Sequence, residues 1–298
     1  MPLTLVANPS SGRGRMARML PQIRSVLAAL GIDTQIEVSR DADDLRRHVR
    51  SAREAGDERV IVCGGDGTLH LAAQELAGGD TALGIVPAGT GDDNARTLGI
   101  PRGDVAGATR LAATGTVSRI DLGRVVVADG AERVFLGVLS SGFDSLVNER
   151  ANVMTWPNGN ARYLVAILGE LRTFRPVPYR ATLDGRPVEG EAMLVAVGNG
   201  VSYGGGMRVC PDAMPDDGLL DVTWLHGVSK ATFLRVFPQV FSGSHVRSPY
   251  VSTTRAASIE LDAPGQLAYA DGERVGPLPA AITVERGALP VVRGVPGA

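Results

Sequence analysis

Lysine is almost absent from this sequence. Of its 30 basic residues only Lys230 is a lysine, and the rest are arginines. A Walker-A phosphate loop needs a Gly-Lys-Ser/Thr tripeptide, so the sequence excludes this way of binding a nucleotide. Any bound phosphate must therefore be neutralised by arginine, by backbone amides, by the N-terminus of a helix or by a metal ion.

Cysteine, histidine and long apolar runs are also scarce. The two cysteines, Cys63 and Cys210, are far apart, and the four histidines show no metal-ligand spacing. The sequence therefore predicts neither a disulfide framework nor a zinc site, and it offers no Ser-His-Asp set for a hydrolase. No apolar run approaches the roughly 20 residues of a membrane-spanning helix, and no signal-peptide pattern is present. We expect a cytoplasmic protein.

The charge balance excludes a global attraction to polyanions. The net charge is −2, so we expect no nucleic-acid partner. A hydrophobic fraction of 44% and a charged fraction of 21% are typical of a globular protein, and 298 residues are enough for two domains with separate cores.

Strand-like apolar runs alternate with helix-period stripes in the first third of the chain. Such repeated units predict a parallel, doubly wound sheet, whose ligands bind beyond the carboxyl ends of the strands. The expected strands are residues 3–7, 32–38, 60–63 and 84–87, and the expected helices cover about 16–30, 43–55 and 69–77, with a further one from Asp93.

The pattern changes at about Asp121. Short strand-like runs, separated by Asp-Gly and glycine-rich turns, predict a mostly antiparallel β domain. We expect the linker near residues 120–124 and a ligand cleft between the two domains. The expected strands include residues 125–127, 135–139, 179–183, 192–197, 220–225 and 256–261, with helices near 162–174 and 229–241.

Three polar, glycine-rich loops each follow a predicted strand of the first domain. They cover residues 8–14, 64–68 and 89–94. Glycines allow tight turns and let backbone amides approach phosphate oxygens, and the helix that follows adds its positive end. Asp66 and Asp93 supply carboxylates in the second and third loops. Three such loops at one edge of a sheet indicate a phosphate site more strongly than any one of them.

The order of the motifs resembles the diacylglycerol kinase catalytic-domain family, specifically the bacterial soluble lipid kinases. The resemblance covers nearly the whole chain and is far more specific than any single loop. The matching stretches are residues 8–14, 64–68, 87–96, 141–144 (Ser-Gly-Phe-Asp), 198–207, 211–221 and 271–273 (Asp-Gly-Glu).

The resemblance implies a fold of two domains. An α/β nucleotide-binding domain, residues 1–122, would be followed by an antiparallel β-sandwich domain, residues 123–285, that receives the lipid. The C-terminal segment, about 286–298, would return to the first domain. The strand pattern of the sequence agrees with this fold.

The resemblance also implies ATP as co-substrate, Mg²⁺ as cofactor, and roles for single residues. Asp66 and Asp93 would be active-site carboxylates, and Glu273 would be the general base that takes the proton from the lipid hydroxyl. A structural metal ion would be held by two backbone carbonyls and one carboxylate, which suits Mg²⁺. The implied metal ligands are Met214, Asp217 and Leu219, and the implied nucleotide-site residues are Asn8, Ser11, Gly14, Gly64, Gly65, Gly67, Thr68 and Thr90.

Most of these carboxylates also have an ordinary structural explanation. Asp66 and Asp93 stand where helix-capping residues are expected. Glu273 follows Asp271-Gly272, a hairpin dipeptide after which a glutamate is usually solvated. The other motifs favour the functional interpretation. The third loop departs from the family, which carries Asn-Asp and an apolar residue where this chain has Asp92-Asp93-Asn94, so nucleotide contacts there are expected to differ.

We therefore expect an ATP-dependent lipid kinase that phosphorylates the hydroxyl of diacylglycerol and gives phosphatidic acid. Another lipid alcohol, such as a sphingoid base, ceramide or phosphatidylglycerol, is the nearest alternative. NAD kinases share the Gly-Gly-Asp-Gly-Thr loop, but their later motifs have no convincing counterpart here. A non-catalytic nucleotide-binding regulator is the third alternative, and the retention of Asp66 and Glu273 argues against it.

A lipid substrate implies transient, peripheral contact with the inner face of the membrane. The stretch from Val153 to Pro157 contains Trp156, and tryptophan suits the membrane interface, although core packing explains the same residues equally well. The sequence leaves a homodimer open.

Overall fold

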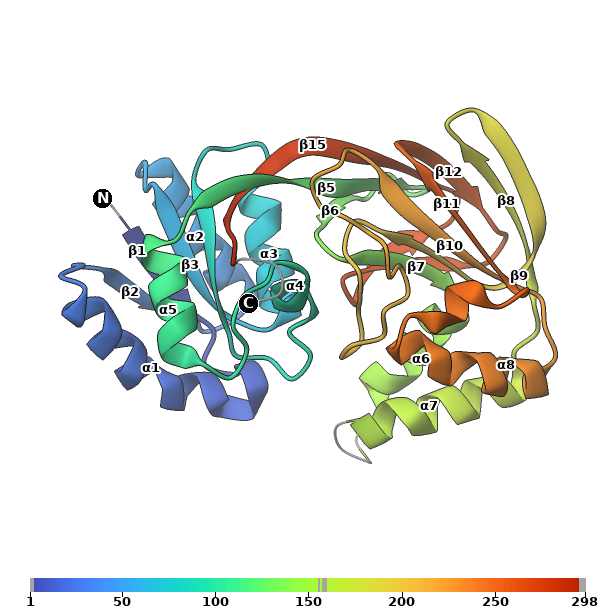
Figure 1. The fold of residues 1–298 in the computed structure, drawn as a ribbon, viewed down its shortest axis with the longest axis horizontal. Coiled ribbons are helices and arrows are strands. Elements are labelled where there is room, and N and C mark those ends of the chain that lie inside the picture. Colours follow the sequence, from blue (N-terminus) through green and yellow to red (C-terminus); the bar gives the residue numbers. More distant parts are fainter. Residues whose placement is uncertain (1–2, 155, 157–159, 295–298) are drawn as a thin grey trace.

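Two units lie side by side along the longest axis of the computed structural model, which describes residues 3–154, 156 and 160–294 (Figure 1). In the first unit, helices cover both faces of a parallel sheet. Its elements are β1 (Leu3–Ala7), α1 (Ser11–Ala29), β2 (Gln35–Val38), α2 (Ala42–Glu54), β3 (Arg59–Gly64), α3 (Asp66–Leu76), β4 (Ala82–Pro87), α4 (Asp93–Thr97) and α5 (Val105–Thr114).

The parallel sheet has the strand order β2-β1-β3-β4. Its central strand, β3, is buried from Val60 to Gly64, as expected for an apolar strand between two helical layers. Asp41 caps α2 by accepting a 2.8 Å hydrogen bond from the amide of Asp44. The predicted doubly wound α/β fold of this part of the chain is confirmed.

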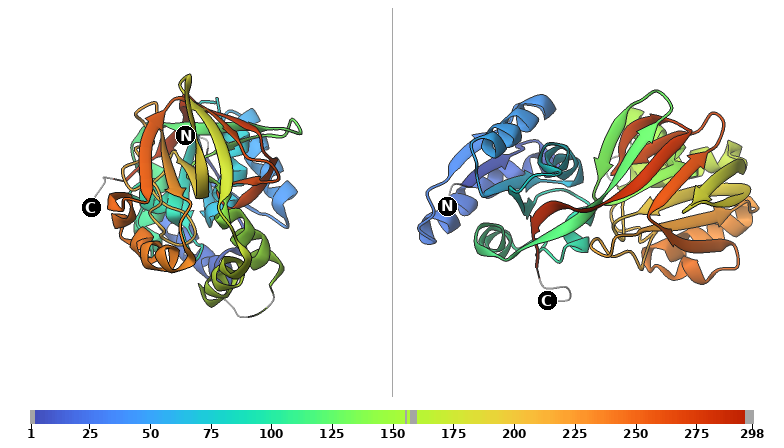
Figure 2. Two further views of the ribbon diagram at one scale, coloured as in Figure 1. Left: turned by 90° about the vertical axis from the view of Figure 1, so that its right-hand side faces the viewer. Right: turned by 90° about the horizontal axis from the view of Figure 1, so that it is seen from above.

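The second unit is an antiparallel β-sandwich with a layer of helices on one side (Figure 2). Tyr179 and Trp224 lie edge to face in its core. Its elements are β5 (Val117–Val127), β6 (Glu132–Phe135), β7 (Val138–Gly142), α6 (Phe143–Val153), α7 (Asn160–Thr173), β8 (Val177–Leu183), β9 (Arg186–Gly198), β10 (Leu220–His226), α8 (Lys230–Val236), η1 (Phe237–Phe241), η2 (Ser244–Arg247), β11 (Val251–Ala256), β12 (Ser258–Asp262), β13 (Leu267–Ala270), β14 (Glu273–Pro277) and β15 (Ala280–Val292).

A long two-stranded ribbon of β5 and β15 joins the two units, and the right-hand view of Figure 2 shows it crossing between them. The far end of β15 pairs with β4 of the first unit, with Val291 opposite Leu83. Residues 120–124, expected as a linker, lie inside β5. Residues 295–298 of the C-terminal segment lie outside the described part.

Two strands expected as continuous are interrupted by carboxylates. The run 135–139 breaks after Phe135, because the amides of Leu136 and Gly137 donate to Asp271 instead of to a neighbouring strand. The run 256–261 breaks at Ala257, whose amide donates to Asp184. Such breaks depend on partners that are distant in sequence.

The helix α6 was not expected from the sequence. It begins directly after Gly142, which has a φ of 104°, and its Phe143 and Val147 pack against α7 and α8 in a separate apolar cluster. No helix in the described ranges is both long and apolar enough to cross a bilayer.

Candidate active site

The loops that follow β1 and β3 are joined by hydroxyl and amide side chains. The side-chain amide of Asn8 donates to Oγ1 of Thr68 over 3.1 Å, and Oγ of Ser11 lies 3.3 Å from the same oxygen. The structure therefore brings Asn8, Ser11 and Thr68 together, as the sequence analysis expected of residues lining one site.

Gly12 shows why the first loop needs glycine. It lies in the left-handed region with a φ of 59°, and a Cβ at this position would be 2.1 Å from the carbonyl oxygen of Ala88. Arg13 and Gly14 are also left-handed. The regular part of α1 therefore starts after Gly14, and residues 12–14 form a tight turn rather than a helix.

Asp66 stands at the start of α3 and faces the loop after β4. Its Oδ1 accepts a 2.9 Å hydrogen bond from the amide of Asn94. Burial raises the pKa of the Asp66 carboxyl to about 6, and the nearby Asp93 carboxylate adds to the rise, although the hydrogen bond from Asn94 opposes it. A perturbed carboxylate among phosphate-compatible loops is typical of a functional site.

The departure at Asp92 has a clear structural effect. This residue is left-handed, with a φ of 50°, and its Oδ1 accepts a 2.8 Å hydrogen bond from the amide of Gly89. Arg15 binds the carbonyl oxygen of Gly89 over 2.7 Å and lies 3.5 Å from the Asp92 carboxylate. The additional carboxylate therefore closes the third loop on itself, while Thr90 at its tip stays exposed.

Asp93 connects the two units. Its Oδ1 accepts hydrogen bonds from Oγ of Ser202, over 2.9 Å, and from the guanidinium of Arg96. Its Oδ2 accepts a 2.7 Å hydrogen bond from the amide of Gly205. Both oxygens thus have protein donors, two of them from the loop that follows β9.

Glu273 lies against the second glycine-rich loop although its side chain is exposed. Its Oε1 is 3.4 Å from the place where a Cβ on Gly67 would be. A carboxylate from the β13–β14 hairpin thus reaches the start of α3, about 200 residues away in sequence. The structure therefore brings Glu273 beside the second of the three loops with which it was expected to converge.

The acidic turn at 211–219 contains the expected metal ligands. Oδ1 of Asp217 accepts a 3.1 Å hydrogen bond from the amide of Leu219, and its Oδ2 contacts the Arg255 guanidinium without accepting a regular hydrogen bond. Oδ2 of Asp221 is buried, has no hydrogen-bond donor among the residues that the structure describes, and lies 3.6 Å from Nε of Arg255. Arg255 thus pairs with both carboxylates. The turn offers carboxylate and backbone carbonyl oxygens, which are ligands that Mg²⁺ accepts, so its donor chemistry fits this ion. Met214, half exposed, can contribute only a backbone oxygen to such a site.

The same turn is fastened to the interdomain ribbon by Asp121, which the sequence analysis placed in a linker. Its two carboxylate oxygens each accept a 2.7 Å hydrogen bond, one from the amide of Gly218 and one from the amide of Gly287. Asn199 donates to the carbonyl oxygens of Asp121 and Leu136. The sequence signal for these contacts was an aspartate within an apolar strand.

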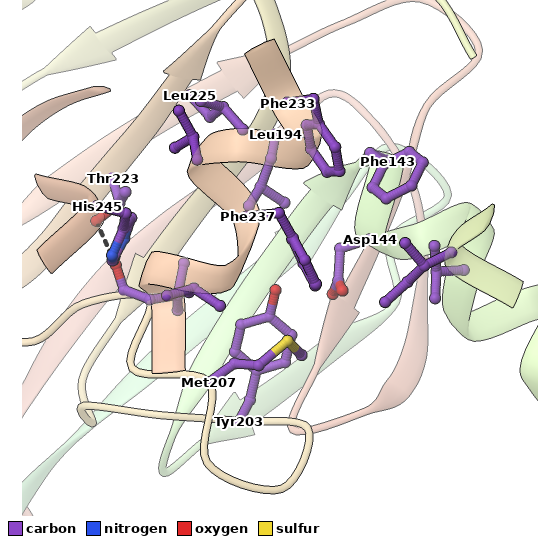
Figure 3. Close-up of a pocket in the computed structure, with 15 residues that line it drawn as sticks. Phe143, Asp144, Leu194, Tyr203, Met207, Thr223, Leu225, Phe233, Phe237 and His245 are labelled. Carbon is purple, nitrogen blue, oxygen red and sulfur yellow. Dashed lines mark hydrogen bonds between the residues drawn. The ribbon is translucent and has the colours of Figure 1, made fainter. Parts of the chain in front are cut away.

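The helical side of the sandwich contains a small apolar cavity with a volume of about 40 Å³ (Figure 3). It lies between α6, α7, the β-sheet, α8 and η1. Residues from the loop after β9 also line it, and this is the loop that binds Asp93. The most prominent apolar lining residues are Phe143, Leu194, Met207, Leu225, Phe233 and Phe237.

One carboxylate lines this mostly apolar cavity. Oδ2 of Asp144 accepts a 2.8 Å hydrogen bond from Oγ of Ser140, and Tyr203 also binds the carboxylate. Burial raises the pKa of Asp144 to about 6, while these two hydrogen bonds oppose the rise. Tyr203 therefore binds the buried Asp144 carboxyl, while its neighbour Ser202 binds Asp93.

Comparison with known protein families divides the chain as the fold does. Residues 2–125 match the diacylglycerol kinase catalytic domain. Residues 137–293 match the YegS C-terminal NAD kinase beta sandwich-like domain. The match therefore extends over both units and the ribbon between them.

Individual relatives are similar over almost their entire length. A diacylglycerol kinase of Mycobacterium tuberculosis is 43% identical over 98% of this chain and 94% of its own. A diacylglycerol kinase of Bacillus subtilis is 29% identical over 92% of this chain and 90% of its own. The crystal structure of a Bacillus anthracis protein assigned as a diacylglycerol kinase superposes with a TM-score of 0.78 at 26% identity, covering 98% of this chain and 97% of the other.

Proposed function

The chain belongs to the diacylglycerol kinase family, and from this premise we propose that it transfers the γ-phosphate of ATP to the hydroxyl of diacylglycerol and produces phosphatidic acid. One observation carries the proposal. The Glu273 carboxylate lies against Gly67, so a base and a phosphate-compatible loop face the same space. Neither group would be useful to a kinase without the other.

In this proposal the three loops hold the nucleotide without a lysine. Backbone amides of the glycine-rich turns and the N-terminus of α3 face the phosphates, and Arg15 lies at the third loop. The hydrogen bonds among Asn8, Ser11 and Thr68 keep the first two loops together. The proposed nucleotide-site residues are Asn8, Ser11, Gly14, Gly64, Gly65, Gly67, Thr68 and Thr90.

The proposed chemical step needs mainly positioning and charge neutralisation. The lipid oxygen forms a bond to the γ-phosphorus while the bond from that phosphorus to the bridging oxygen of ADP breaks. Glu273 accepts the hydroxyl proton as the new bond forms, because the pKa of an alcohol is too high for prior ionisation. Mg²⁺, when bound with ATP, would neutralise the developing charge, and the Asp66 carboxylate at the start of α3 would hold it. We assign Asp93 the task of holding the loop of Ser202 and Gly205 beside this centre.

The apolar cavity supports a lipid as the second substrate. A nucleoside or a sugar would find few hydrogen-bond partners in a cavity lined by phenylalanine, leucine and methionine side chains. An acyl chain, in contrast, gains about 0.8 kcal/mol of transfer free energy for each buried methylene. The loop after β9 connects the cavity with Asp93, so a chain held there would leave its headgroup near the phosphate loops.

We further propose that Met214, Asp217 and Leu219 hold a structural Mg²⁺ through two carbonyls and one carboxylate. The oxygen chemistry of the turn supports this, and Arg255 would have to move away from Asp217 when the ion binds. The ion would stabilise the turn that Asp121 ties to the ribbon.

We propose that the enzyme meets its substrate from the cytoplasmic side of the membrane, where ATP is available. Val153 and Trp156 support peripheral contact, because each is 79% exposed at the end of α6. Exposed tryptophan is common at membrane interfaces. Residues 155 and 157 of the same expected stretch lie outside the described part.

A lipid panel tests the proposed substrate. The purified protein is incubated with labelled ATP, Mg²⁺ and mixed micelles containing diacylglycerol, ceramide, a sphingoid base or phosphatidylglycerol, and NAD is offered separately. We expect label in phosphatidic acid. Label in another lipid with diacylglycerol untouched would overturn the substrate, NADP formation would favour a NAD kinase, and nucleotide binding without any product would favour a regulator.

A further inference from the structure

The aspartate of the β13–β14 turn points into the protein. Asp271 and Gly272 have φ values of 52° and 86°, which is the left-handed pair of a two-residue hairpin turn. An aspartate in such a turn is usually solvated, but the side chain of Asp271 is only 1% exposed. A carboxylate buried so deeply requires hydrogen-bond donors.

Three donors surround this carboxylate. The amide of Gly137 donates to Oδ1 over 2.8 Å, and the amide of Leu136 donates to Oδ2 over 3.0 Å. Nδ1 of His70 lies 3.1 Å from Oδ2, and the histidine side chain is 3% exposed. A carboxylate can only accept in this pair, so the imidazole donates through Nδ1.

These donors come from both units. Leu136 and Gly137 lie between β6 and β7 of the second unit, whereas His70 belongs to α3 of the first. The hairpin itself pairs with β7 and is therefore part of the second unit. In the described part of the chain, the hydrogen bond from His70 to Asp271 is what links this turn to α3.

The position of His70 on α3 places this link beside the proposed chemistry. Gly67 lies one turn earlier on the helix, and a Cβ on it would be 3.4 Å from Oε1 of Glu273, which lies two residues after Asp271 on the hairpin. A hydrogen bond and a close approach between the same two elements, separated by about 5 Å along the helix axis, define both the distance and the orientation of the hairpin.

We propose that His70 is a positioning residue: by donating to Asp271 it sets the place of the Glu273 carboxylate relative to the phosphate loop. The proposal rests on the proposed lipid kinase function. His70 does not touch the reacting atoms in this arrangement. Its effect passes through the turn, which the amides of Leu136 and Gly137 alone would hold only to the second unit.

The same helix offers a matched control. Gln74 lies one turn beyond His70 and also binds the second unit, accepting from the amide of Val134 over 3.1 Å and donating to its carbonyl oxygen over 2.7 Å. Gln74 thus supports docking of the two units without contacting the hairpin turn. His70→Leu and Gln74→Leu separate positioning of Glu273 from docking in general.

Steady-state kinetics with the lipid substrate is the first test. A displacement of about 1 Å in a reacting group costs roughly 100-fold, so kcat of His70→Leu should fall by about 30- to 100-fold. KM for ATP should stay within about 2-fold, since the nucleotide loops are unchanged. His70→Gln, which restores an N–H donor, should recover most of the activity, and Gln74→Leu should keep kcat near that of the wild type. If His70→Leu is not recovered folded, His70→Ala replaces it.

A double variant tests whether His70 acts through Glu273. In the Glu273→Gln background, His70→Leu should reduce kcat no further, because there is no base left to position. Independent, multiplicative losses would overturn the proposal, as would equal losses in His70→Leu and Gln74→Leu.

Amide hydrogen exchange tests the same link without substrate. In His70→Leu, exchange should accelerate at residues 136–137 and 271–274 and stay unchanged in the turn at 211–219; unaltered protection of the hairpin would overturn the proposal. This measurement decides the role of His70 even if the lipid panel shows no kinase activity, so failure of the proposed function is distinguishable from failure of this inference.

Discussion

Asp271 and Glu273 show how far two neighbouring carboxylates can differ in one hairpin. The Asp271 side chain is buried and has three donors, whereas Glu273 is exposed and faces Gly67. Local sequence assigns both to a solvated turn. Their different environments arise because α3 and the segment between β6 and β7 approach the hairpin from different parts of the chain.

Replacement of Glu273 by glutamine removes the proposed base and keeps the size of the side chain. We expect ATP binding to be unchanged and phosphorylation to fall by about 10² to 10⁴-fold, the usual contribution of a general base. Nucleotide titration and initial rates measure the two effects. Glu189→Gln, an exposed glutamate on β9, is the control. Turnover that is unchanged in Glu273→Gln would exclude this residue from the mechanism.

The buried Asp144 predicts that the difference in stability between the wild type and an Asp144→Asn variant depends on pH. Its folded-state pKa of about 6 lies above the ordinary value of 3.8, so the folded protein favours the protonated form. Burial of the carboxyl therefore does not lower the free energy of unfolding below about pH 4. As the pH rises through 6, the burial of the ionised form lowers this free energy by up to about 3 kcal/mol. Asp144→Asn avoids this ionisation.

Thermal unfolding of both proteins between pH 4 and 7.5 measures the effect. The Tm of Asp144→Asn relative to the wild type should rise as the pH increases. A difference that stays constant over this range would show that the carboxyl does not titrate as burial requires.

At the scale of elements, the ends of β1, β3 and β4 form the proposed nucleotide side of the site. Buried apolar runs followed by glycine predicted these strand ends, because the carboxyl ends of parallel strands meet at one edge. The cavity was not predictable in this way. It depends on α6, whose Phe143 and Val147 are buried only because α7 and α8 cover them.

The cavity should set acyl-chain preference. Leu194 lines it and is half-buried, so Leu194→Trp should fill part of the space without overpacking the core. Loss of room for two methylenes lowers kcat/KM for long-chain diacylglycerol by roughly 15-fold, with little effect on dioctanoylglycerol. The control Leu234→Trp, on the exposed face of α8, should alter neither substrate. Equal losses for both chain lengths in Leu194→Trp would argue against an acyl site.

At the scale of the whole molecule, the β5–β15 ribbon and a few buried carboxylates fix the two units relative to each other. Asp93 binds the loop after β9, Asp121 binds Gly218 and Gly287, and Asp271 binds His70. Each carboxylate accepts from donors on segments distant in sequence. The geometry of the site therefore depends on docking of the units as a whole.

A structural Mg²⁺ at the 211–219 turn should stabilise this arrangement. Saturating Mg²⁺ should raise the Tm of the wild type by about 5 °C, and Asp217→Ala should abolish the increase. Asp216→Ala is the matched control, because this neighbouring carboxylate pairs with Arg293 and is not an expected ligand. Thermal scans with Mg²⁺ and with chelator measure both variants. An equal increase in wild type and Asp217→Ala would reject the site.

The sequence by itself determined the parallel sheet, the glycine-rich strand ends and the family, because these follow from local periodicity, from turn chemistry and from the order of motifs. It did not determine the roles of His70, Asp121 and Asp271, or the apolar cavity beside α6. Those depend on which buried groups meet across the two units, and a buried carboxylate takes whichever donors the tertiary structure brings to it. Hydrogen bonds between distant segments, rather than local preference, decided where the Glu273 carboxylate lies.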